Sequence, residues 1–109
     1  VMLRTVHISN DSILNYGSLQ IDTNNHRVVR DGVTVDLTVR EYAILEYLVR
    51  NRNIVVTREQ IRANIWSIDD DINSNVVDVY IRYLRRKIDD PFEEKLIHTI
   101  RGVGYRLEC

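Results

Sequence analysis

Residues 74–88 carry side chains whose types and spacing suit contact with nucleic acid. The stretch is Ser-Asn-Val-Val-Asp-Val-Tyr-Ile-Arg-Tyr-Leu-Arg-Arg-Lys-Ile. At about 100° per residue, one helical face would hold a polar and basic set with two tyrosines on its flanks. The face comprises Asn75, Val79, Arg82 and Arg86, and the flanks carry Tyr80 and Tyr83. Arginine can donate two hydrogen bonds to guanine, asparagine pairs similarly with adenine, and tyrosine can reach a phosphate. This set predicts a groove-binding helix; the alternative is a solvated basic helix.

The opposite face of the same stretch is apolar. Val77, Ile81, Leu84 and Ile88 fall within roughly 60° of one another on a helical projection, which predicts a buried stripe. Ser74 is the predicted N-cap, since its hydroxyl can accept from a free N–H of the first turn. Asp89-Asp90-Pro91 ends the helix, because proline disfavours helical geometry in the preceding residue.

Charge is distributed unevenly along the chain. The 109 residues have a formal net charge of −1, so any nucleic-acid contact must come from a local basic cluster. Residues 74–88 contain four basic residues against Asp78 alone, while Asp69, Asp70 and Asp71 precede them. Hydrophobic residues at 44% and charged residues at 28% are typical of a globular domain, and the length allows one real core. Residues 1–11 are a linker or lead-in, and residues 12–109 the predicted domain.

Several classes of site are disfavoured. Cys109 is the only cysteine, so an internal disulfide is impossible and a reducing compartment fits. His7, His26 and His98 have no partner at metal-ligand spacing, and we expect neither a metal nor a cofactor. No catalytic Ser/His/Asp set, carboxylate pair or phosphate loop is evident, so we do not expect an enzyme. No apolar run approaches the ~18 residues of a membrane span and no signal peptide is apparent, which predicts a cytoplasmic location.

The elements that would position the basic helix lie on both sides of it. Short alternating strands are predicted over residues 12–37, with Asp31-Gly32 as a hairpin turn. Capping boxes at 38–41 and 57–60 open two helices, the second ending near Trp66 before a polar loop over 67–73. After the basic helix, two β-prone runs flank residues 101–104 and predict a hairpin with Arg101 at its tip.

The order of these elements resembles the winged helix-turn-helix of the C-terminal effector domain of OmpR/PhoB-type response regulators. The motifs are Leu-Thr-Val-Arg-Glu-Tyr at 37–42, Thr-Arg-Glu-Gln at 57–60 with Trp66, the stretch 75–88, and Thr-Ile-Arg-Gly-Val-Gly-Tyr at 99–105. Each motif alone is weak, but together they are specific and the resemblance covers residues 12–108. It implies an α+β fold with an N-terminal antiparallel four-stranded sheet, three helices and a C-terminal β-hairpin wing.

The resemblance also implies roles. The helix from Asn75 would enter the major groove of double-stranded DNA, and Arg101 the minor groove. Positions matching Arg58, Trp66 and Tyr105 would touch phosphates. The implied DNA-binding residues are Arg58, Trp66, Ser74, Asn75, Val79, Tyr80, Arg82, Tyr83, Arg85, Arg86, Thr99, Arg101 and Tyr105. Implied partners are an operator of direct repeats bound by a dimer, RNA polymerase at loop 67–73, and an upstream receiver domain with its sensor kinase.

Structural alternatives stand beside these roles. Trp66 can be packed in the core, and Tyr80 and Tyr83 can shield its edge. Asp78 lies four residues before Arg82 and can simply orient it. Arg85 lies toward a flank, where it can pair with a core-side acid or touch a phosphate. For the whole chain, the alternatives are a protein-binding winged helix, or the same DNA-binding domain in a membrane-anchored one-component regulator.

Overall fold

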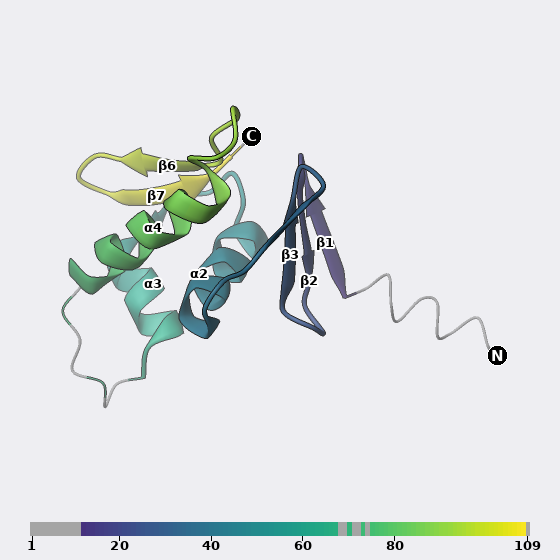
Figure 1. Ribbon diagram of the computed structural model, residues 1–109. Coiled ribbons are helices and arrows are strands. Elements are labelled where there is room, and N and C mark those ends of the chain that lie inside the picture. Colours follow the sequence, from purple (N-terminus) through teal and green to yellow (C-terminus); the bar gives the residue numbers. More distant parts are fainter. Residues whose placement is uncertain (1–11, 68–69, 71–72, 74, 109) are drawn as a thin grey trace. The chain divides into compact units, whose positions relative to one another are not determined.

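The computed structural model describes residues 12–67, 70, 73 and 75–108, and the chain divides between Asp36 and Leu37 into two compact units (Figure 1). The first unit is an antiparallel sheet in the order β1-β2-β3-β4. Its strands are β1 Ile13–Tyr16, β2 Leu19–Asp22, β3 Arg27–Arg30 and β4 Val33–Val35. The predicted four-stranded sheet is therefore confirmed.

The turns of this sheet follow from residues that tolerate positive φ. Asp31 and Gly32 connect β3 to β4 with φ of 53° and 80°, as an Asp-Gly hairpin requires. The turn after β2 spans residues 23–26, and His26 closes it with φ of 52° before β3 begins. Asp22 stabilises that turn by accepting from the Asn25 side chain at 2.9 Å, and this hydrogen bond lowers the pKa of the carboxyl.

The second unit begins with α2 Val39–Arg50 and continues through β5 Val56–Thr57, α3 Arg58–Ile65, α4 Asn75–Ile88, β6 Ile97–Ile100 and β7 Gly104–Leu107. Both predicted capping boxes are present, with Thr38 and Glu41 opening α2 and Thr57 and Gln60 opening α3. In Figure 1, α4 lies between the β6–β7 hairpin and the pair α2 and α3. No described helix is both long and apolar enough to cross a bilayer.

The C-terminal sheet contains a strand that the sequence patterns did not predict. Its order is β5-β7-β6, so the predicted hairpin gains a third strand of two residues. Gly104 makes this possible, since a Cβ there would lie 2.0 Å from the Val56 carbonyl oxygen. Gly102 has φ of 76° and forms the hairpin turn. The two glycines of the predicted turn therefore have different roles: Gly102 allows the positive φ of the turn, and Gly104 allows the close approach of β5.

Two buried carboxylates fix the ends of helices in this unit. Glu41 is 3% exposed and accepts from Lys87 Nζ at 2.7 Å, which joins the start of α2 to the end of α4. Burial alone would raise the pKa of Glu41, but hydrogen bonds from Lys87 and the Thr38 backbone reverse the sign and lower it. Asp89, 2% exposed, accepts from the backbone N–H groups of Leu96 and Ile97 at 3.0 Å each, which holds the start of β6 against the end of α4.

Candidate nucleic-acid interface

Helix α4 has the two faces that its sequence predicts. Its four apolar stripe residues, Val77, Ile81, Leu84 and Ile88, are each at most 1% exposed. On the outward face, Asn75, Arg82 and Arg86 are exposed and Val79 is half-buried. Ser74, the predicted N-cap, lies outside the described residues. The outward face therefore offers amide and guanidinium donors on a helix whose rotation is fixed by the core.

An aromatic run crosses from the end of α3 to the middle of α4. The Trp66 and Tyr80 ring centroids are 5.5 Å apart, and those of Tyr80 and Tyr83 are 5.8 Å apart, both edge to face. Trp66 is only 5% exposed, and the Arg40 guanidinium lies 4.9 Å from its ring. Trp66 is thus packed, as the structural alternative predicted, whereas Tyr83 remains 40% exposed.

Asp78 joins three elements near the start of α4. Its Oδ2 accepts from Arg58 Nη1 of α3 at 2.9 Å, and its Oδ1 accepts from the Tyr105 hydroxyl of β7. The structural alternative, in which Asp78 only orients Arg82, does not describe this carboxylate, because donors from α3 and β7 converge on it. Burial and this contact raise the pKa of Tyr105 to about 12. Tyr105, already neutral at physiological pH, therefore stays a hydrogen-bond donor over a wider pH range.

Arg85 connects α4 to the wing, the hairpin formed by β6 and β7. Its guanidinium donates to the Ile97 carbonyl at 3.0 Å and to Thr99 Oγ1 at 2.7 Å, and it lies 5.6 Å from the Tyr105 ring centroid. Of the two alternatives for Arg85, pairing with a core-side acid is therefore not the one that forms. A backbone carbonyl of β6 takes that place, because the hairpin and not another helix covers this flank of α4.

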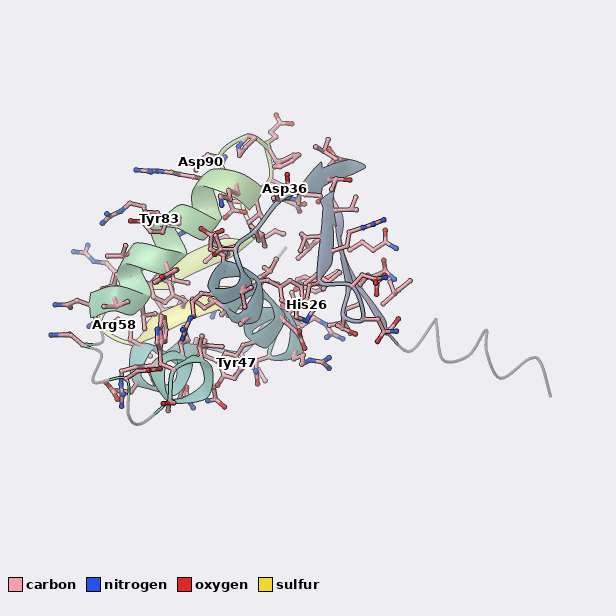
Figure 2. The ribbon with its side chains drawn as sticks, turned by 60° about the horizontal axis from the view of Figure 1, so that its bottom comes forward. His26, Asp36, Tyr47, Arg58, Tyr83 and Asp90 are labelled. Carbon is pink, nitrogen blue, oxygen red and sulfur yellow. The ribbon has the colours of Figure 1, made fainter. Side chains whose placement is uncertain are left out.

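A hollow of about 280 Å³ opens between the wing and the starts of α3 and α4. Arg58, Asp78, Arg101 and Tyr105 are among the residues that line it. Figure 2 shows Arg58 projecting beside the first turn of α4, with Tyr83 further along the same helix. Arg101 is exposed in the turn of the hairpin. Cationic side chains from α3 and the wing thus flank the outward face of α4.

The predicted site residues fall into three groups. Arg58, Arg85, Thr99, Arg101 and Tyr105 surround or adjoin the hollow; Trp66, Tyr80 and Tyr83 form the aromatic run; Asn75, Val79, Arg82 and Arg86 occupy the outward face. Sequence reasoning did not include Asp78 or Arg40 in the site. The partners of Asp78 lie 20 and 27 residues away, and Arg40 donates at 3.1 Å to the Ile65 carbonyl, 25 residues away, so no local pattern could have revealed these contacts.

The chain matches a family model over residues 32–107, and that family is described as "Transcriptional regulatory protein, C terminal". The chain belongs to this OmpR/PhoB-type family. Its four-stranded sheet, three helices and C-terminal hairpin are the winged helix-turn-helix that the sequence predicted.

Known relatives agree with this assignment. The response regulator ArlR of Staphylococcus saprophyticus is 46% identical over 94 residues, which cover 86% of this chain and 43% of ArlR. The Thermotoga maritima response regulator DrrB, an OmpR/PhoB homologue, superposes with a TM-score of 0.79 at 35% identity over 90% of this chain and 45% of DrrB. The Klebsiella pneumoniae RstA DNA-binding domain, solved in complex with the RstA box, superposes with a TM-score of 0.77 at 30% identity. The match covers 88% of this chain and 96% of the RstA domain. The chain spans less than half the length of the curated relatives it matches.

Proposed function

We propose that this domain binds double-stranded DNA in a sequence-specific manner, as the effector domain of a two-component response regulator that controls transcription. The observation that carries the proposal is the outward face of α4. Asn75, Arg82 and Arg86 are exposed there, while the opposite stripe is fully buried. A helix with this division fits the major groove, where each base pair presents a distinct pattern of donors and acceptors. The RstA domain, which shares the fold, was solved bound to DNA.

The two basic elements take different grooves in this proposal. Arg82 faces base edges in the major groove, with Asn75, Val79, Tyr83 and Arg86 around it. Arg101, in the narrow turn of the wing, enters the minor groove, where mainly width and A·T content can be distinguished.

The remaining site residues position the domain on the DNA backbone. We assign phosphate contacts to Arg58, Ser74, Tyr80 and Thr99, because such contacts fix register without selecting sequence. We assign two roles to Trp66, Arg85 and Tyr105, which hold the surface through contacts within the protein and also approach the DNA backbone.

We propose the other parts of the full-length protein from its likeness to longer relatives. A receiver domain preceding this one, a partner sensor kinase, and a dimer on direct repeats suit a chain that spans less than half of relatives such as ArlR. We place the protein in the cytoplasm, and residues 67–73 are the candidate contact with RNA polymerase.

The direct test is selection of bound duplexes from a random pool, followed by binding measurements on single-base-pair variants of the selected site. Arg82→Ala should weaken the best site by ~1–3 kcal/mol and relax preference at one or two positions. Arg101→Ala should weaken binding in proportion to the A·T content beside the core site. Arg50→Ala, at an exposed arginine of α2 paired with Glu46, is the matched control and should change neither.

Two outcomes would contradict the proposed function or the role of Arg82. If the domain is not retained on heparin or random duplex at low salt, a protein-binding winged helix is the better assignment. If Arg82→Ala weakens every variant equally, Arg82 contacts phosphate, and specificity belongs to Asn75, Val79 or Tyr83.

A further inference from the structure

Asp78 places a carboxylate on the surface that, in the proposed function, meets DNA. It lines the hollow between the wing and the helices, and its side chain is 34% exposed. A negative charge there repels phosphates at any sequence, so charge alone makes Asp78 unfavourable for binding. Its contacts indicate what offsets that cost.

Both carboxylate oxygens are used, and the two donors come from different elements. Arg58 is the first residue of α3 and Tyr105 lies in β7, next to the strand that ends at the wing turn. Arg58 uses Nη1 for Asp78, and a guanidinium has five N–H donors in a rigid fork. Its other donors can therefore reach a phosphate while Asp78 fixes the plane of the fork.

A second set of contacts, made by Arg85, joins the same flank of α4 to the wing. Arg85, two turns after Asp78, donates to the backbone of Ile97 and to Thr99 in β6 and lies against the Tyr105 ring. Asp78 and Arg85 thus join the recognition helix to both strands of the wing. These contacts therefore help to set the distance between α4 and the wing.

Resting on the proposed function, we propose that Asp78 is a positioning residue for DNA recognition, one that fixes the wing and Arg58 relative to α4. The repulsion it causes acts equally on every duplex. The benefit is realised only on the operator, where both groove contacts must be made at once. Asp78 therefore raises the preference for specific over non-specific DNA.

The test is Asp78→Asn, which keeps the shape and an acceptor oxygen but removes the charge. Binding is measured on a duplex selected by the unaltered chain and on a scrambled duplex of the same composition, at fixed salt. We expect about tenfold weaker binding to the selected duplex, a change within about threefold on the scrambled one, and a weaker dependence on flanking A·T content. Loss of charge alone predicts the opposite sign, tighter binding to both duplexes.

Asp90→Asn is the matched control. It makes the same charge change at an exposed residue two positions beyond the end of α4, whereas Asp78 lies in the first turn of that helix. Figure 2 shows Asp90 at the far end of α4 from Arg58. Asp90→Asn should leave the ratio of the two affinities unchanged.

Tyr105→Phe separates positioning from a general loss of fold. It keeps the buried ring and removes only the hydroxyl that donates to Asp78, so it should lower the ratio as Asp78→Asn does. The double variant should then fall no further than about threefold below either single variant, because both remove one contact. Additive losses, or an unchanged ratio in Asp78→Asn, would overturn the positioning role. If the unaltered chain itself does not distinguish the two duplexes, the proposed function fails instead.

Discussion

Two aspartates stand near opposite ends of α4 and both connect the helix to the wing, but their partners differ in kind. Asp89 is 2% exposed and accepts from two backbone N–H groups at the start of β6. Asp78 is a third exposed and accepts from two side chains, Arg58 and Tyr105. One carboxylate substitutes for missing backbone partners, whereas the other organises groups that face the proposed DNA surface.

This difference separates stability from recognition. A buried N–H group that loses its acceptor has no water to replace it, so the loss appears in the free energy of unfolding. A partly exposed ion pair contributes little to stability because solvent competes for both charges. We therefore expect changes at Asp89 to unfold the domain and changes at Asp78 to alter its DNA preference.

The largest effect should come from Asp89→Ala. It leaves the N–H groups of Leu96 and Ile97 without their acceptors, and each such loss costs about 1–3 kcal/mol. The free energy of unfolding should fall by roughly 2–6 kcal/mol in a urea titration. Asp90→Ala, at the exposed neighbouring residue, is the control and should stay within about 0.5 kcal/mol. Equal effects at the two positions would contradict the comparison.

The apolar stripe of α4 provides a reference for the expected change in the free energy of unfolding. Leu84 is fully buried, so Leu84→Ala should destabilise the domain by ~2–5 kcal/mol through the cavity it leaves. A thermal melt would report the change, with Arg82→Ala, two residues away on the exposed face, as the control. An unchanged melt would mean that the helix is rotated differently from the structure.

Local sequence patterns predicted the buried stripe of α4 much better than the contacts of Asp78. The stripe of α4 and both capping boxes depend on residues three or four positions apart, so periodicity was sufficient. The role of Asp78 depends on Arg58 and Tyr105, 20 and 27 residues away, and the nearby Arg82 offered a plausible but wrong partner. Only the folded arrangement of α3, α4 and β7 brings these groups together.

Strand β5 was missed for a related reason. Two residues are too few to show alternation, and Val56-Thr57 is a strand only because β7 lies beside it. The sequence did contain a signal in Gly104, where the close approach of Val56 excludes a side chain. That glycine was assigned to the turn, because a contact across 48 positions cannot be recognised from neighbouring residues.

Arg58→Ala sharpens the contrast by changing binding with little change in stability. Its ion pair with Asp78 is about half exposed on the arginine side, so unfolding should change by less than about 1 kcal/mol. Binding should weaken similarly for all sequences, and the slope of log K against log salt should flatten by about one unit. Arg50→Ala should leave the slope as it was. A change in which operator is preferred would show that Arg58 is not a backbone contact.

The smallest expected effect is spectroscopic, and it reports on the hydrogen bond between Tyr105 and Asp78 in the free protein. The pKa of Tyr105 lies at about 12 rather than 10.0, because of burial first and then the hydrogen bond and charge of Asp78. Folding therefore favours the protonated phenol, so its contribution to stability is complete below pH 10 and is lost as the pH rises toward 12. The ultraviolet absorbance of tyrosinate should include a late step near pH 12, and Tyr105→Phe should remove that step. Asp78→Asn should move the step to lower pH, whereas Asp90→Asn should not. If Asp78→Asn leaves the Tyr105 step unchanged, Tyr105 does not donate to Asp78 in solution. Asp78 would then have Arg58 as its one side-chain donor, and its contrast with Asp89 would rest on that ion pair alone.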